Sequence, residues 1–194
     1  MRFKPPMLNV FNGVFNGLSR DRRKAGELYG RVVAAARQPE LYMSMGVPDT
    51  AEGRFEMVAL MLFLGLERLQ GAGAGAEKLQ QLAIEQFVTD MDDCFREMGV
   101  GDLTVPKKVR RAAAAFYERS GAYRTALNAQ SADPALEQAL MCYVYEKRPA
   151  EKFAGPLAAY VRLARARLRD LSDVAALTGD LVFPAPTSAP RTPS

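Results

Sequence analysis

The sequence has 194 residues, 48% of them apolar, and a net charge of +4 from 26 basic and 22 acidic side chains. This length suits one domain, and the apolar fraction is sufficient for a hydrophobic core. The chain contains no histidine, the commonest general base and metal ligand. Carboxylate- or lysine-based catalysis stays open, but we expect neither an enzyme nor a bound cofactor or metal.

The longest apolar run covers residues 57–66, ten residues, whereas a membrane-spanning helix needs about 20. Pro5 and Pro6 interrupt any signal-peptide core, and no small-residue cleavage site follows. We therefore expect the chain to remain in the cytoplasm or an equivalent compartment.

The charge is unevenly distributed along the chain. Residues 1–37 hold eight basic and two acidic side chains, whereas residues 38–98 hold four basic and eleven acidic ones. A chain with this asymmetry can present a basic and an acidic surface to different partners.

Residues 1–20 contain no acidic side chain, and their apolar residues recur at helical spacing. Glycines and asparagines lower the helix propensity there. One interpretation is a flexible arm that packs partly on the domain; the other is a short interfacial segment near the membrane. In the second case the contacts would be Phe11 and Phe15 with acyl chains, and Arg20, Arg22 and Arg23 with anionic lipid.

Helical periodicity predicts a first helix over about 21–37, followed by a long connection that packs down on the domain. The second helix, about 50–70, is apolar nearly all round over 57–66 and is expected to be central and buried. Gly65 would let a neighbouring helix approach it closely. The third helix, about 77–98, has a regular apolar stripe, and Gly99 follows it in a position typical of a left-handed helix end.

A fourth helix is predicted from Pro106 to about Leu127, a fifth from Pro134 to before Pro149, and a sixth ending at Leu171. No strand-like alternation occurs. We predict an all-α fold of about six helices in one domain, residues 21–175, with a disordered proline-rich tail over 180–194. Cys94 and Cys142 lie in apolar helical patterns and are expected to be buried thiols, although a disulfide is not excluded.

Three carboxylates, Asp90, Asp92 and Asp93, crowd the polar face of the third helix. They diverge around the helix and no loop wraps them, which argues against a metal site. Asp92 and Asp93 also precede Arg96 at favourable helix-pair spacing. The remaining alternative is an acidic face that recognises a basic partner.

A basic run, Lys107, Lys108, Arg110 and Arg111, opens the fourth helix, where the helix dipole is already positive. It is either a solvated face or a site for an anionic partner such as ribosomal RNA, lipid headgroups or an acidic protein. The arginines of the sixth helix at 162, 165 and 169 are expected to form a solvent-facing row.

Two blocks of sequence distinguish this chain from other helical domains. The first is Gly46-Val47-Pro48-Asp49-Thr50 with Gly53-Arg54-Phe55, and the second is Arg96-Glu97-Met98-Gly99-Val100-Gly101-Asp102. Together with Leu28-Tyr29, Asp90-Met91-Asp92 and Phe116-Tyr117, they resemble the ubiquinol–cytochrome c chaperone family over about residues 25–145. The chain departs from the family pattern at Leu60-Met61-Leu62, where a histidine is common.

The resemblance implies an all-helical, non-enzymatic chaperone that binds newly made cytochrome b and promotes assembly of the cytochrome bc complex. Mitochondrial relatives act with a small partner protein near the ribosome exit. Because this chain lacks a transit peptide, we expect a bacterial form, cytoplasmic and peripheral to the inner membrane. It would be a monomer or a complex with a small partner, with the ribosome exit region and an anionic membrane as further candidate partners, but not DNA.

The acidic third helix would meet basic loops of cytochrome b, and the basic fourth helix would face lipid or ribosome. The alternative function is a peripheral ribosome- or RNA-binding protein, and a membrane-surface scaffold ranks third. The residues expected to bind client or partner are Arg54, Glu56, Asp90, Asp92, Arg96, Glu97, Asp102, Lys107, Lys108 and Arg111.

Overall fold

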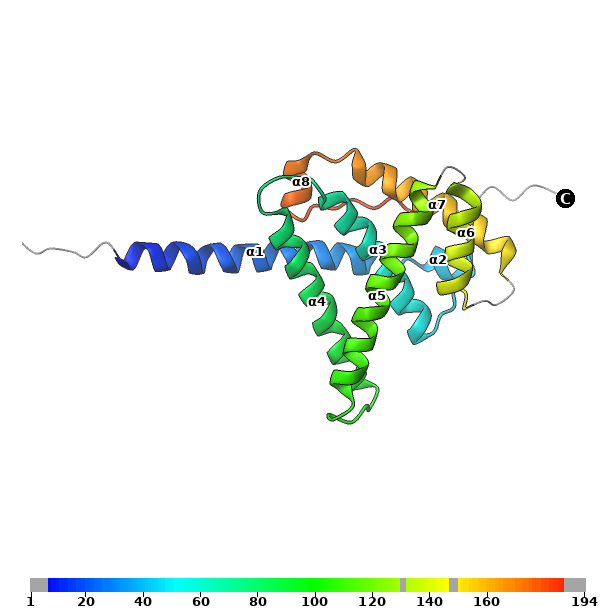
Figure 1. Cartoon of the computed structure of the whole chain (residues 1–194), viewed down its shortest axis with the longest axis horizontal. Coiled ribbons are helices and arrows are strands. Elements are labelled where there is room, and N and C mark those ends of the chain that lie inside the picture. The colour runs from blue at the N-terminus through cyan, green and yellow to red at the C-terminus, as the bar shows by residue number, and fades with distance from the viewer. Residues whose placement is uncertain (1–6, 130–131, 147–149, 187–194) are drawn as a thin grey trace, which may run out of the picture.

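The computed structural model describes the backbone of residues 7–129, 132–146 and 150–186, and within these ranges every regular element is an α-helix. Figure 1 shows one helical body from which two elements project. This confirms the predicted all-α fold. The helices are α1 (Met7–Ala36), α2 (Pro39–Met43), α3 (Ala51–Leu69), α4 (Ala76–Glu97), α5 (Val105–Asn128), α6 (Ala132–Tyr143), α7 (Glu151–Arg169) and α8 (Asp173–Leu177).

The central helix is α3, as the sequence predicts. Every residue from Met57 to Gly65 is buried, and α3 packs against α1, α4, α5, α7 and α8. A helix surrounded in this way has no solvent-facing side over its middle turns, which is why its sequence is apolar nearly all round. No helix in the described part of the chain is both long and apolar enough to cross a membrane.

Helices α4 and α5 form a hairpin whose distal half projects from the body (Figure 1). We call this distal half, residues 90–118, the arm, and its turn, residues 98–104, the tip. Tilted ring contacts hold the hairpin together and join it to α3: the ring centroid of Phe87 lies 5.8 Å from that of Phe55 and 5.3 Å from that of Phe116. The arm is therefore continuous with the hydrophobic core.

The first sequence block forms the connection that leads into α3. Gly46 has φ +64°, and an added Cβ would lie 2.6 Å from the ring of Phe153. A Cβ at Gly53 would lie 2.0 Å from the Pro48 carbonyl oxygen. Thr50 caps α3 by accepting the Gly53 N–H at 3.1 Å. The glycines and Val47 of the block thus serve a tight, packed turn, whereas its Asp49, Thr50 and Arg54 are exposed.

Several predicted boundaries need correction. The helix expected over 21–37 is the second half of α1, which starts at Met7 and extends beyond the body in Figure 1. The connection does pack down, as predicted, and it contains α2 with Leu41 and Met45 buried. The short helix α8 was not predicted because five residues are too few for a periodic signal.

The C-terminal segment also differs from the prediction of disorder, over residues 180–186. Leu181 is 1% exposed and is the nearest neighbour of a Cβ at Gly65, at 2.8 Å, while Val32 of α1 lies 3.7 Å away. The Tyr160 hydroxyl donates to the Pro184 carbonyl at 3.2 Å. Residues 187–194 lie outside the described residues.

The expectation that both thiols are buried was wrong. Cys94 is partly buried and Cys142 is exposed, although both are free thiols; position 142 lies on the edge of the apolar stripe and not within it. Gly99 has the predicted left-handed φ of +76°, but Gly101 does not have a positive φ and has open space around it. Only one of the two glycines in the tip is therefore required by the backbone.

Candidate functional site

Glu56 is a structural tie and does not line a surface. Its side chain is 7% exposed, and both carboxylate oxygens accept from Nε of Arg119 on α5, at 2.8 and 2.6 Å. Burial raises the pKa of Glu56, and the Arg119 guanidinium partly offsets this. Arg119 also lies over the Tyr143 ring, 4.9 Å from its centroid. The expectation that Glu56 contacts a partner is thus corrected, because its oxygens already have an internal partner.

Asp90 likewise joins two helices. The hydroxyl of Tyr29 on α1 donates to its Oδ2 at 2.7 Å. Burial raises the pKa of Tyr29, and the neighbouring carboxylate adds to that rise. Asp90 is part-buried and bonds Tyr29 of α1, so it has a part in α1–α4 packing, and its assignment as a binding residue stays a prediction.

Arg54 is exposed at the start of α3. Its Nε lies 2.7 Å from Oδ1 of Asp49, and this hydrogen bond lowers the pKa of Asp49. Both side chains are more than half exposed, so the pair adds little stability. Arg54 remains a surface residue, but it belongs to α3 and not to the arm.

The structure gathers the other predicted residues on the arm. Arg96 Nε donates to Asp92 Oδ2 at 2.5 Å, and its Nη1 pairs with Asp102 of the tip. The hydrogen bond with Asp92 raises the pKa of Arg96. One guanidinium therefore links the last turns of α4 to the tip, beside the left-handed Gly99 that ends the helix.

Lys107, Lys108 and Arg111 are exposed at the start of α5, together with Arg110. None of the four forms an ion pair with any residue that the structure describes. The ammonium of Lys108 lies 5.5 Å from the centroid of the Phe95 ring on α4. We call these four residues the basic cluster; it is available to an anionic partner.

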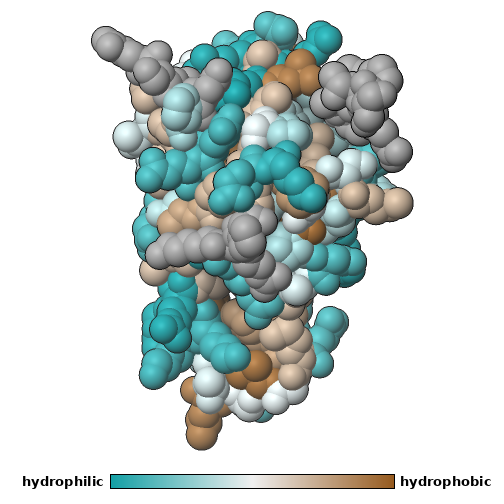
Figure 2. Space-filling view, turned by 90° about the vertical axis from the view of Figure 1, so that its right-hand side faces the viewer, coloured by the Kyte–Doolittle hydropathy of each residue, from teal (hydrophilic) through white to brown (hydrophobic). Residues whose placement is uncertain are grey.

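Sequence reasoning missed three exposed apolar residues of the arm. Leu103 is 99% exposed, Met98 56% and Tyr117 60%. Figure 2 shows hydrophobic surface at the lower end of the molecule, where the tip lies in Figure 1. The available signal was a leucine in a glycine-containing turn between two helices, a position where polar residues are usual.

The acidic surface of α4 also differs from the predicted one. Glu85, Asp93 and Glu97 are exposed and lie four or eight residues apart, so they share one ridge of the helix. Of these, the sequence analysis placed Asp93 in the candidate acidic face and Glu97 among the candidate binding residues, but it did not single out Glu85. We call these three the acidic ridge.

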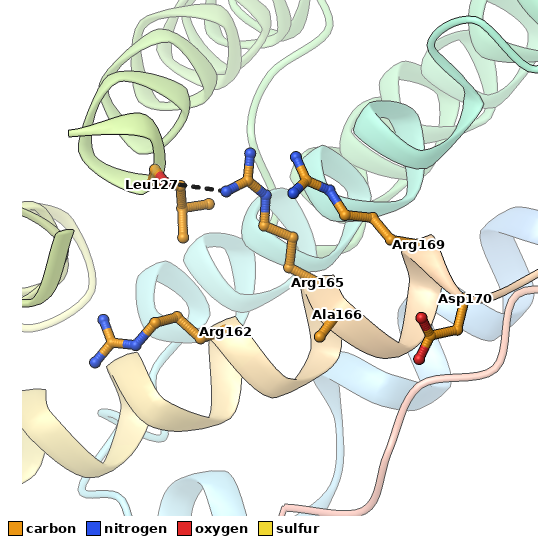
Figure 3. Close-up of a pocket in the computed structure, with 6 residues that line it drawn as sticks. All are labelled: Leu127, Arg162, Arg165, Ala166, Arg169 and Asp170. Carbon is orange, nitrogen blue, oxygen red and sulfur yellow. Dashed lines mark hydrogen bonds between the residues drawn. The ribbon is translucent and has the colours of Figure 1, made fainter. Parts of the chain in front are cut away.

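A pocket lies beside α7, away from the arm (Figure 3). It is lined by Leu127, Arg162, Arg165, Ala166, Arg169 and Asp170. Arg165 does not face solvent freely, contrary to the prediction. Its guanidinium binds Glu67 on α3, the Leu127 carbonyl at 3.0 Å and Asn128 Oδ1 at 2.8 Å. Those contacts tie α7 to α3 and to the end of α5, and they satisfy most of its donors.

The predicted membrane residues are only partly described. The side chains of Phe11 and Phe15 lie outside the described residues. Arg20, Arg22 and Arg23 are exposed on α1, and Arg23 pairs with Glu27 at 2.9 Å. Among described residues, no group of three potential ligands is arranged to hold a metal ion.

A helical body that presents a charged, partly apolar arm to solvent has the architecture of a protein that binds other macromolecules. The family model described as ubiquinol–cytochrome C chaperone matches residues 43–183. The chain therefore belongs to the ubiquinol–cytochrome c chaperone family, in agreement with the resemblance of its two sequence blocks.

A solved structure supports this assignment. The crystal structure of the Cbp3 homolog from Brucella abortus shares 36% sequence identity, with a TM-score of 0.81 over 91% of this chain and 97% of that chain. A comparison with curated proteins finds no significant match. The family and this relative make the protein an assembly chaperone for ubiquinol–cytochrome c reductase.

Proposed function

We propose that this chaperone binds newly synthesised cytochrome b and promotes its incorporation into the cytochrome bc complex. The observation that carries the proposal is the likeness to a Cbp3 homolog along nearly its whole length, in a chain that matches the chaperone family. We further propose a bacterial, cytoplasmic protein, peripheral to the inner membrane, that acts alone or with a small partner protein.

The acidic ridge is the proposed client-binding surface. Asp93 and Glu97 are exposed and no ion pair involving them is found among the described residues, so a basic client segment could reach them without displacing an internal cation. Tyr117, also on the arm, offers exposed aromatic surface for the apolar part of a helical client. Charge complementarity of this kind mainly accelerates and orients encounter.

Client capture tests the proposal. The tagged chain is expressed in its native host, membranes are solubilised gently, and co-purifying proteins are identified. We expect cytochrome b with the wild type, and loss of it with the charge reversal Asp93→Lys/Glu97→Lys. The matched control is Glu77→Lys/Asp170→Lys, which makes the same change in charge at two exposed positions away from the arm.

Equal recovery of cytochrome b by both double variants, each shown to be folded, would remove the acidic ridge from the proposal. Absence of cytochrome b from the wild-type sample would contradict the client itself. Exposed residues are suitable for this test because substitutions at such positions usually change stability little.

The basic cluster favours a second candidate function, binding to the ribosome or to RNA. Its four cations lie within five residues of one helix and have no acidic partner in the described structure. Recovery of ribosomes or RNA without cytochrome b, with affinity that falls steeply as salt rises, would favour this candidate.

A further inference from the structure

We propose that the tip of the arm is a membrane-contact site, in which Leu103 and Met98 enter the acyl region of an anionic bilayer while the basic cluster binds lipid phosphates. This contact site is separate from the N-terminal segment and does not depend on the identity of the client. It rests on the proposed peripheral position at the inner membrane and assigns the surface that makes the contact.

The backbone of the tip holds Leu103 away from the protein. Gly99 reverses the chain after α4, and the Val100 N–H donates to the Phe95 carbonyl at 3.0 Å. On the other side, the Thr104 N–H donates to the Gly101 carbonyl at 2.7 Å, and Val105 is fully buried. Leu103 stands between these two anchored ends and is 99% exposed. Packing within the protein therefore does not explain why an apolar side chain is present at position 103.

The charges around the tip favour an anionic surface. Residues 96–111 carry five basic and two acidic side chains, a net charge of +3, whereas the other acidic side chains of the arm, Asp90, Asp92, Asp93 and Glu118, lie on α4 and α5 toward the body. The acidic residues within 96–111 are Glu97, which is exposed, and Asp102, which is paired with Arg96. Each basic side chain near an anionic leaflet adds to the attraction, and the apolar residues add a term that does not depend on salt.

The distances match the layers of a bilayer. From Val105 to Arg111, α5 rises by about 9 Å at 1.5 Å per residue. Interfacial segments bury their apolar side chains about 5 to 10 Å into the boundary between headgroups and acyl chains. With Leu103 and Met98 at that depth, the basic cluster lies at the level of the phosphates.

The shape of the tip distinguishes lipid from other partners. The apolar side chains form a convex end of a projecting hairpin (Figures 1 and 2), whereas a stable protein interface needs about 800 Å² on each partner. An RNA partner would engage the basic cluster but would leave Leu103 in water. A fluid bilayer can take up the small apolar tip among its acyl chains while its phosphates bind the basic cluster.

The chain contains no tryptophan, so a single one introduced at the tip reports on its own surroundings. The experiment uses the full-length chain and the variant Leu103→Trp, with Val174→Trp as control, since Val174 is 74% exposed on α8, outside the arm. The probes are vesicles of phosphatidylcholine with a minor fraction of phosphatidylglycerol, and vesicles of phosphatidylcholine alone. We expect a blue shift and quenching by brominated acyl chains for Leu103→Trp with the anionic vesicles only.

Flotation with the same vesicles supplies a second measurement. Leu103→Ser should weaken binding about tenfold, the loss expected for one buried leucine, and Val174→Ser should not. Arg111→Gln should weaken it several-fold, whereas Arg167→Gln, an equally exposed arginine on α7, should not.

Three results would overturn the proposal. The first is no blue shift for Leu103→Trp with anionic vesicles. The second is unchanged flotation of Leu103→Ser, with flotation lost only when residues 1–20 are deleted. The third is an Arg111→Gln variant that binds RNA more weakly but binds vesicles like the wild type. The second would assign membrane contact to the N-terminal segment, and the third would assign the basic cluster to RNA.

Discussion

Nε of Arg119 lies 2.8 and 2.6 Å from the two carboxylate oxygens of Glu56, and this pair joins α5 to α3 below the protein surface. The two residues are 63 positions apart in the sequence. Removal of one partner from a buried pair leaves an uncompensated charge, whereas replacement of both can be nearly neutral. The pair therefore ties α5, just beyond the arm, to the buried central helix.

Arg119→Met should destabilise the protein by about 3 kcal/mol, because the Glu56 carboxylate stays buried without its cation. The measurement is the free energy of unfolding from urea titration at neutral pH. The double variant Glu56→Gln/Arg119→Met should recover a large part of the loss. A double variant less stable than Arg119→Met would contradict this account.

The same carboxylate predicts a pH dependence with a defined sign. Burial raises the folded-state pKa of Glu56 above its usual 4.5, so the folded state binds this proton more tightly than the unfolded state. Stability from this group is fully present below pH 4.5 and is lost as pH rises through the folded-state pKa. The free energy of unfolding of the wild type minus that of Glu56→Gln, measured by urea titration across that pH window, should decrease as pH rises. A difference that rises would mean that Arg119 outweighs burial.

Two glycine substitutions should act in opposite directions. Gly53→Ala places a Cβ 2.0 Å from the Pro48 carbonyl oxygen and should cost about 2 kcal/mol or more, because the clash is with backbone. Gly121→Ala, on α5 with nothing within 4 Å, should stabilise by up to about 1 kcal/mol through helix propensity. Thermal melts of both variants test this, and similar shifts in Tm would refute the packing argument.

The two thiols should differ in reactivity. Cys142 is exposed, whereas Cys94 is partly buried, and burial together with nearby Asp90 raises the pKa of Cys94. Because the thiolate is the reacting species, an aromatic disulfide reagent at mildly alkaline pH should label Cys142 first and Cys94 slowly. Cys142→Ser should remove the fast phase. Two equally fast phases in the folded wild type would show that α4 opens readily.

The periodic signals in the sequence were sufficient for α3 to α7 and the second half of α1, but not for the short helices α2 and α8. The apolar run 57–66 predicts a buried central helix, and Gly99 predicts a left-handed helix end, because both effects arise within a few turns of one helix. The two sequence blocks identified the family, since they encode a tight turn into α3 and the end of α4.

Only the tertiary structure decided which charged residues are exposed and which are bound internally. Glu56 and Asp90 look like surface charges in a helical pattern, yet Arg119 and Tyr29 bind them across 63 and 61 residues. Leu103 is a large apolar residue, yet the arm carries it into solvent. Periodicity reports the face of one helix, whereas burial depends on which other helix covers that face, and that is a property of the packed fold.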